Sequence, residues 1–159
     1  MTYIFFWRQT EVPFGVFSQW SMQNFTVNEI VYSCTEQYMM AEKARLFGDT
    51  DTEAEIMSAT KPNDFKRLGR KVKNFDQTTW EKSAFNIVVE GNIAKFQQNP
   101  ELLAILLATG NSILVEASPY DKIWGIGMKS SDKRATTPTQ WLGDNLLGQA
   151  LMKVRDRLT

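Results

Sequence analysis

The chain contains no histidine and a single cysteine, Cys34, among its 159 residues. Histidine is the commonest general base near neutral pH and a frequent zinc ligand. Acid–base chemistry in this protein must therefore use carboxylates and lysines, and we expect no bound metal. One cysteine leaves no intramolecular disulfide, so we expect an intracellular, cytoplasmic protein.

Neither sign of charge is in excess, because 18 lysines and arginines balance 18 aspartates and glutamates. Tight non-specific binding to nucleic acid depends on many phosphate contacts and hence on a surplus of positive charge. We therefore do not expect a protein that coats nucleic acid, although a local basic patch remains compatible with the composition. No apolar run is long enough to span a membrane, and the one at the N-terminus is too short for a signal peptide.

No repeat, linker or composition break divides the sequence, so we expect one domain over residues 1–159. Aromatic residues make up 12% of the chain and include five tryptophans. Such rings fill a core or line a pocket, and composition alone leaves both uses open.

Periodicity and end signals predict a mainly α fold with minor β structure. We expect a strand at Tyr3–Trp7, a loop at Pro13–Trp20, a hairpin at Phe25–Tyr32 that turns at Asn28–Glu29, and a strand at Ser112–Ser118. We expect helices at 33–47, 52–58, 62–69, 79–96, 100–109 and 145–158. Ser33 and Glu36 match a capping box for the first helix, and Asp144 is the expected cap of the last.

Glu36 and Lys43 form the first candidate site. The step of seven positions from one to the other turns a helix through about 700°, which places both on one face, roughly 10 Å apart along the axis. Met40 lies between them on that face, which indicates partial burial. Two interpretations stay open: a capping acid with a surface lysine, or two charges that border a cavity.

Two further segments carry candidate residues. SPYDKIWGIG contains Asp121, Trp124 and Gly125 after a predicted strand, which is typical of a loop that holds a ligand and equally of a structural turn with a core tryptophan. FKRLGRKVKNF has five basic residues within eight positions, which either bind phosphate or form a solvated face. The basic residues are Lys66, Arg67, Arg70, Lys71 and Lys73.

In combination these segments resemble the NADAR family, which is also called YbiA-like. The matching segments are PFGVFSQW, TEQYMMAEKA, Gly69–Arg70, Trp80, FQQNPELLAILLATGNSILVEASPYDKIWGIG and NLLGQALMKVR, and they follow the family's order over nearly the whole chain. The resemblance implies a single compact multihelical domain with minor β structure, and no cofactor.

The resemblance further implies an N-glycosidase, a hydrolase that cleaves the bond between ribose C1 and a nitrogen. One associated substrate is ADP-ribose attached to guanine, including guanine in nucleic acid, and this is the substrate that we favour. The other is the group of phosphorylated ribosylamino-pyrimidine intermediates of riboflavin biosynthesis. A non-catalytic ADP-ribose-binding module is the second alternative, against which the intact Glu36–Lys43 pair argues.

The family's motif assigns roles to the two charges of the predicted first helix and to the loop acid. Lys43 corresponds to the lysine that forms a Schiff base with ribose C1, and Glu36 to the acid that moves protons. Asp121 would hold ribose hydroxyls or assist proton transfer. Gln37 departs from the family pattern, because many relatives have histidine there.

The resemblance also implies a set of substrate-binding residues. Trp80 and Trp124 would wall the ribose or stack on the base, and Arg70 would bind a phosphate oxygen. Gly125 would let the backbone approach the ligand. Arg8 and Phe14 belong to the N-terminal part of the motif and complete the expected set.

Overall fold

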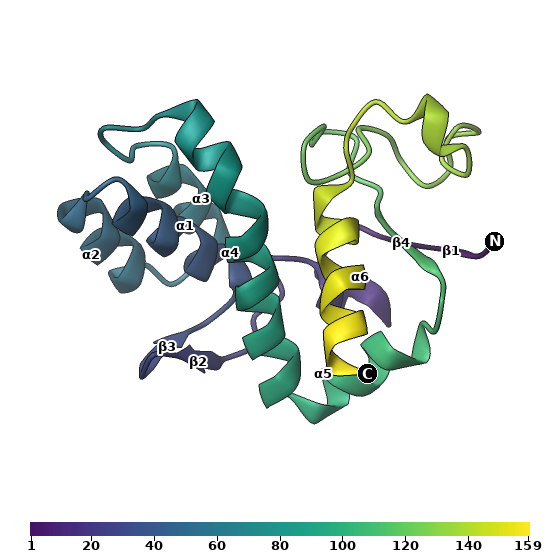
Figure 1. The fold of residues 1–159 in the computed structure, drawn as a ribbon, viewed down its shortest axis with the longest axis horizontal. Coiled ribbons are helices and arrows are strands. Elements are labelled where there is room, and N and C mark those ends of the chain that lie inside the picture. The colour runs from purple at the N-terminus through teal and green to yellow at the C-terminus, as the bar shows by residue number, and fades with distance from the viewer. The chain divides into compact units, whose positions relative to one another are not determined.

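The structure is a computed structural model that describes all residues 1–159, and the chain divides into two compact units (Figure 1). The terminal unit comprises Met1–Ser21 and Pro100–Thr159, and the central unit comprises Met22–Asn99. Six α-helices and four short strands confirm the prediction of a mainly α fold with minor β structure. None of these helices has both the length and the apolarity that crossing a membrane requires.

The central unit contains four helices and one hairpin. Its elements are β2 (Phe25–Val27), β3 (Ile30–Tyr32), α1 (Thr35–Leu46), α2 (Thr50–Ser58), α3 (Pro62–Gly69) and α4 (Gln77–Gln98). The predicted hairpin is confirmed, since β2 and β3 pair in antiparallel fashion around Asn28 and Glu29. Both turn residues have positive φ, 50° and 68°, as a two-residue type I′ turn requires.

Helix α1 is the centre of this unit and packs against α2, α3 and α4, the group of helices on the left of Figure 1. Glycines on two neighbouring helices allow close approach. A Cβ at Gly69 of α3 would lie 1.9 Å from Met40 Sδ, and one at Gly91 of α4 would lie 2.5 Å from Tyr38 Cδ1. Consequently, α1 is buried on most of its circumference, and the eight buried residues are Thr35, Glu36, Gln37, Tyr38, Met39, Met40, Ala41 and Ala44.

The predicted capping box at the start of α1 is wrong. The N-cap residue is Cys34, so the N3 position, whose side chain reaches back in a capping box, is occupied by Gln37 and not by Glu36. Gln37 Oε1 accepts hydrogen bonds from Ser33 N (2.8 Å) and Ser33 Oγ (3.0 Å), while Gln37 Nε2 donates to the carbonyl of Ile56 (3.2 Å). Glu36 therefore does not occupy the capping-box position.

Two other helices start earlier than predicted because an aspartate caps each of them. Asp49 accepts a hydrogen bond from Thr52 N (3.1 Å), and α2 begins at Thr50. Asp76 accepts one from Thr79 N (2.9 Å), and α4 begins at Gln77. Helix α3 matches its predicted bounds, with Pro62 in the first turn.

The terminal unit is built around two parallel strands. Its elements are β1 (Tyr3–Phe6), the 3-10 helix η1 (Phe14–Phe17), α5 (Pro100–Ala108), β4 (Ile113–Glu116), the 3-10 helix η2 (Pro138–Gln140) and α6 (Leu146–Leu158). Strand β1 pairs with β4 in the register Tyr3–Ile113 to Phe6–Glu116, which confirms both predicted strands. The Pro13–Trp20 segment, expected as a loop, contains η1.

Helix α6 packs on β4 through a buried stripe of Leu147, Leu151 and Val154. Leu158, at the end of the helix, is half-buried. A second apolar cluster joins β4 to the loops that follow it, and it consists of Val115, Ala117, Ile126, Met128 and Ala135.

The expectation that Asp144 caps α6 is wrong, because Asn145 is the N-cap residue. Asn145 has φ 54°, a conformation that asparagine adopts more readily than most residues. Its Oδ1 accepts from Glu116 N (2.9 Å) and its Nδ2 donates to the carbonyl of Leu114 (3.0 Å). An aspartate carboxylate cannot donate the second bond, so only the amide side chain can join the start of α6 to β4.

We predict that Asn145→Ala lowers the free energy of unfolding by at least about 2 kcal/mol, because it leaves a buried N–H and a buried C=O without their partner. Urea denaturation monitored by circular dichroism measures the change. Asp144→Ala is the matched control at an exposed neighbour, and it should change the value by less than about 0.5 kcal/mol. An equal or larger loss for Asp144→Ala would restore Asp144 as the capping residue.

Candidate active site

The amine of Lys43 lies against two aromatic rings in the central unit. Lys43 Nζ is 4.7 Å from the ring centroid of Phe75 and 5.5 Å from that of Trp80. Phe75 belongs to the loop between α3 and α4, whereas Trp80 lies in the first turns of α4. Lys43 is itself half-buried. The two rings shield part of this half-buried side chain from solvent.

The surroundings of Lys43 lower the pKa of its amine below the ordinary lysine value. Burial is the largest cause, because removing water penalises the charged ammonium. The carboxylate of Glu36 acts in the opposite direction and raises this pKa, while the guanidinium of Arg70 lowers it. The net effect is a larger fraction of neutral amine, which is the nucleophilic form.

Glu36 shares the Lys43 face of α1 and is only 8% exposed. Met40, between the two on the same face, is 7% exposed, so the prediction that this face is partly buried is confirmed. Because Glu36 is buried and does not occupy the N3 position of a capping box, the interpretation of this acid as a capping-box residue is wrong. The face instead carries a carboxylate and an amine whose charges interact in a shielded environment.

The loop that carries Phe75 is held in place by Asp49. Asp49 Oδ2 accepts a hydrogen bond from the backbone N–H of Lys73 (2.9 Å), and this bond, together with those from Thr52, lowers the pKa of Asp49 to about 2. Phe75 also contacts Phe47 at 5.4 Å between centroids. Phe75 was not among the residues predicted from the sequence. Only its position between the basic run and Asp76 could have pointed to it.

A second lysine with a lowered pKa, Lys95, lies in α4 and was also missed. Its side chain is fully buried, and this burial lowers the pKa of its amine to about 7, although the neighbouring Cys34 raises that pKa. A substrate cannot reach an amine without exposed surface. Of these two lysines, only Lys43 is therefore accessible as a nucleophile.

In the terminal unit, Asp121 shapes the loop after β4. Its Oδ1 accepts hydrogen bonds from the backbone N–H groups of Ile123 (2.9 Å) and Trp124 (2.8 Å). A Cβ at Gly125 would lie 2.9 Å from the carbonyl oxygen of Glu116 and 3.0 Å from that of Asp121, so the turn requires glycine. These contacts support the structural interpretation of the loop, and the roles of its residues toward a substrate stay predictions.

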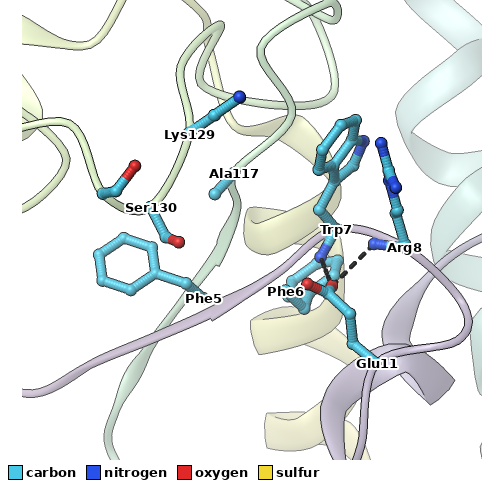
Figure 2. A pocket seen from close by; sticks show the side chains of 9 residues that line it. Phe5, Phe6, Trp7, Arg8, Glu11, Ala117, Lys129 and Ser130 are labelled. Carbon is cyan, nitrogen blue, oxygen red and sulfur yellow. Dashed lines mark hydrogen bonds between the residues drawn. The ribbon is translucent and has the colours of Figure 1, made fainter.

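Two expected residues lie in the N-terminal part of the terminal unit. Phe14 stacks on Phe17, with centroids 5.6 Å apart and planes 20° apart. Arg8 is exposed, with its Cζ 4.5 Å from the ring centroid of Trp7. Arg8, Trp7 and Lys129 line a pocket of about 340 Å³ (Figure 2). The sequence analysis singled out neither Trp7 nor Lys129.

The expected site residues therefore fall into separate groups. The central unit brings together Glu36, Lys43, Arg70 and Trp80. The charges of Glu36 and Arg70 act on the Lys43 amine, and the ring of Trp80 contacts it. The terminal unit places Asp121, Trp124 and Gly125 on one loop and Arg8 and Phe14 near its N-terminus. No three cysteine, aspartate or glutamate side chains gather as a metal-binding group.

Comparison with known proteins identifies the family. A model of the NADAR domain matches residues 5–159. The chain belongs to the NADAR domain family. The NADAR match extends over both units and includes all nine expected site residues.

Several NADAR relatives are named N-glycosidases. N-glycosidase R617 of Acanthamoeba polyphaga mimivirus is 48% identical, over 97% of this chain and 95% of the relative. N-glycosidase YbiA of Escherichia coli (strain K12) is 31% identical, over 94% of this chain and 84% of the relative. The NMR structure of E. coli YbiA matches with a TM-score of 0.81 and 30% identity, covering 99% of this chain and 84% of that one. These relatives support hydrolysis of an N-glycosyl bond by this NADAR protein.

A further relative is named for riboflavin biosynthesis. The chloroplastic riboflavin biosynthesis protein PYRR of Zea mays is 30% identical over 91% of this chain, which spans 23% of that longer protein. The NADAR region thus also matches part of a larger protein named for riboflavin biosynthesis.

We predict that the pKa of Lys43 responds to its two charged neighbours in opposite directions. Arg70→Ala should raise it, because a cation that disfavours the ammonium is lost, and Glu36→Gln should lower it further. The rate of Lys43 acetylation by acetic anhydride as a function of pH, followed by peptide mass spectrometry, measures the apparent value. Wild-type Lys43 should titrate below the ordinary value of about 10.4.

The matched control for these variants is Glu81→Gln, which removes an exposed acid in α4 that is not among the charges acting on Lys43. It should leave the titration of Lys43 unchanged. Equal shifts in all three variants, or an ordinary value for the wild type, would contradict the electrostatic description of this site.

Proposed function

We propose that the protein is an N-glycosidase that removes ADP-ribose from ADP-ribosylated guanine, with Lys43 as the nucleophile. The observation that carries the proposal is the accessible Lys43 amine, whose pKa is lowered among aromatic rings and within reach of the Glu36 charge. Hydrolysis of an N-glycosyl bond has the support of the named homologues. The guanine substrate and the imine route are proposed here in addition to that general activity.

The reaction begins when the neutral amine of Lys43 attacks ribose C1. The new C1–N bond forms as the bond from C1 to the guanine nitrogen breaks, and the departing nitrogen takes a proton from the acid form of Glu36. The Glu36 carboxylate then takes a proton from the attached nitrogen and passes it to the ring oxygen as the bond from C1 to that oxygen breaks, which opens the ribose and leaves a protonated imine between C1 and Lys43. Water adds to C1 while the Glu36 carboxylate accepts its proton, and release of the sugar aldehyde regenerates the free amine.

The proposed roles of Glu36 and Lys43 make opposing electrostatic demands. A carboxylate close enough to move protons also stabilises the ammonium form of the lysine and so reduces its nucleophilicity. Burial and the positive charge of Arg70 counter this effect, and the direction of the Lys43 pKa shows that they prevail. We propose that Arg70 also binds a substrate phosphate, which would reduce its influence on Lys43 once substrate is bound.

The remaining expected residues would position the substrate. In this proposal Trp80 and Trp124 contact the ribose or the base. Asp121 would bind ribose hydroxyls through Oδ2, since Oδ1 already accepts two backbone N–H groups.

A basic face near Arg70 favours substrates that contain several phosphates. Lys66, Arg67, Arg70, Lys71 and Lys73 are all exposed, on α3 and the loop that follows it. Arg67 pairs with the carboxylate of Asp64 at 3.5 Å. Because the same loop carries Phe75 beside Lys43, this face supports guanine within nucleic acid as the substrate.

A second candidate function is hydrolysis of phosphorylated ribosylamino-pyrimidine intermediates of riboflavin biosynthesis. The similarity to part of a riboflavin biosynthesis protein of Zea mays favours it. The same Lys43 chemistry serves both substrates, because each presents a ribose C1–N bond. Turnover of these intermediates without turnover of ADP-ribosylated guanosine would select the second candidate.

A non-catalytic ADP-ribose-binding module is the remaining alternative. Such a module gains nothing from an amine that is kept partly neutral beside a carboxylate. Binding of ADP-ribose that persists in a protein without any hydrolytic activity would favour the module.

We predict that Lys43→Ala lowers the rate of hydrolysis of ADP-ribosylated guanosine by at least roughly 10³-fold, because the covalent route is lost. Sodium borohydride added during turnover should reduce the imine and attach the sugar to Lys43 of the wild type through a stable secondary amine. Intact-mass and peptide-mass spectrometry detect the adduct, which should be absent from Lys43→Ala.

Lys82→Ala, which removes an exposed lysine of α4, is the matched control and should retain both turnover and the adduct. Circular dichroism establishes that the Lys43→Ala variant is folded. Substantial turnover by folded Lys43→Ala would remove Lys43 from the mechanism, and turnover without any wild-type adduct would argue against the imine.

We predict that the double variant Lys71→Glu/Lys73→Glu binds an ADP-ribosylated DNA oligonucleotide more weakly, with the slope of log affinity against log salt reduced by about two. The kcat/KM for free ADP-ribosylated guanosine should stay unchanged, because it lacks the flanking phosphates. Fluorescence anisotropy at several salt concentrations measures the slope. The double variant Lys82→Glu/Lys133→Glu, at exposed positions outside the basic face, makes the same change in charge, and an equal effect there would show that only net charge matters.

A further inference from the structure

The pocket of the terminal unit is lined by residues of that unit alone. Its walls come from β1 and the residues that follow it, from Ala117 after β4, and from the segment at Lys129. Its volume of about 340 Å³ is at the lower end of the range of small-molecule sites. Its size therefore suits one part of a nucleotide-containing substrate and not a whole ADP-ribose.

An aromatic surface forms one side of this pocket. The guanidinium of Arg8 covers Trp7 at 4.5 Å from the ring centroid, and Figure 2 shows Trp7 between Arg8 on one side and Ala117 and Lys129 on the other. Tyr120 contacts Trp7 at 5.8 Å between centroids. The indole is thus held by neighbours from two segments, and a planar group can stack on the side that faces the pocket.

Polar groups without protein partners line the opposite side. Lys129 forms no ion pair, and the hydroxyls of Ser130 and Ser131 form no hydrogen bonds with the protein. Figure 2 shows the Lys129 ammonium and the Ser130 hydroxyl beside the space in front of Ala117. A cation with adjacent hydroxyl donors is a suitable set for a phosphate group.

The one carboxylate of the pocket is already committed to the backbone. Glu11 Oε1 accepts hydrogen bonds from Trp7 N (2.7 Å) and Arg8 N (2.8 Å), which hold the turn that follows β1. Arg8 and Lys129 together outweigh its charge, so the lining carries a net positive charge that favours an anion.

We propose that this pocket binds a nucleoside 5′-phosphate group, with the base stacked on Trp7 and the phosphate held by Lys129 and the two serine hydroxyls. The inference goes beyond the proposed function, because every group that it names belongs to the terminal unit.

Binding of AMP to the full chain tests the proposal. In ¹H–¹⁵N NMR spectra, AMP should shift the indole N–H of Trp7 and the amides of residues 129–131, with ribose 5-phosphate and inorganic phosphate binding more weakly. Lys129→Glu should weaken AMP binding about tenfold or more, the effect of losing a charge-assisted contact. Lys133→Glu, an exposed change in the same loop that does not line the pocket, should not weaken it.

Shifts confined to other residues, equal effects of Lys129→Glu and Lys133→Glu, or equal affinity for AMP and inorganic phosphate would each overturn the proposal. Hydrolysis assays distinguish this failure from failure of the proposed function. Hydrolysis of ADP-ribosylated guanosine by a protein in which AMP shifts neither Trp7 nor residues 129–131 would refute the pocket and leave the function standing. AMP binding at Trp7 without hydrolysis would do the reverse.

Discussion

The burial of helix α1 is the constraint on which the candidate site depends. Three helices enclose α1, and glycines at 69 and 91 let two of them approach its side chains closely. Glu36 and Lys43 are consequently held in an environment with little water. Desolvation is the largest influence on the Lys43 pKa, so the packing of α1 decides the state of the amine before any substrate arrives.

Structural and chemical tasks fall on different side chains around this helix. Gln37 makes the hydrogen bonds at its start, and Asp49 anchors the loop that carries Phe75. The charge of Glu36 acts on Lys43. The glutamine at position 37, where many relatives are expected to have histidine, suits a reaction performed by a carboxylate and an amine.

The terminal unit shows the same separation of tasks on a smaller scale. Asn145 joins α6 to β4, and Asp121 organises the adjoining loop through one carboxylate oxygen. Glu11 holds the turn after β1, which leaves the cations of the nearby pocket in excess. In both units, polar residues that bind the backbone fix the surfaces on which exposed charges and rings are presented.

The sequence by itself determined the elements with local signals: the Asn28–Glu29 hairpin, the proline at the start of α3, and the mainly α fold class. Its helical spacing also placed Glu36, Met40 and Lys43 on one face. Only the tertiary structure decided that Phe75 lies beside Lys43, that Asp49 binds Lys73, and that Asn145 binds Leu114. Periodicity and capping depend on residues a few positions apart, whereas these contacts and the desolvation of Lys43 arise when segments separated by 24 to 32 positions pack together.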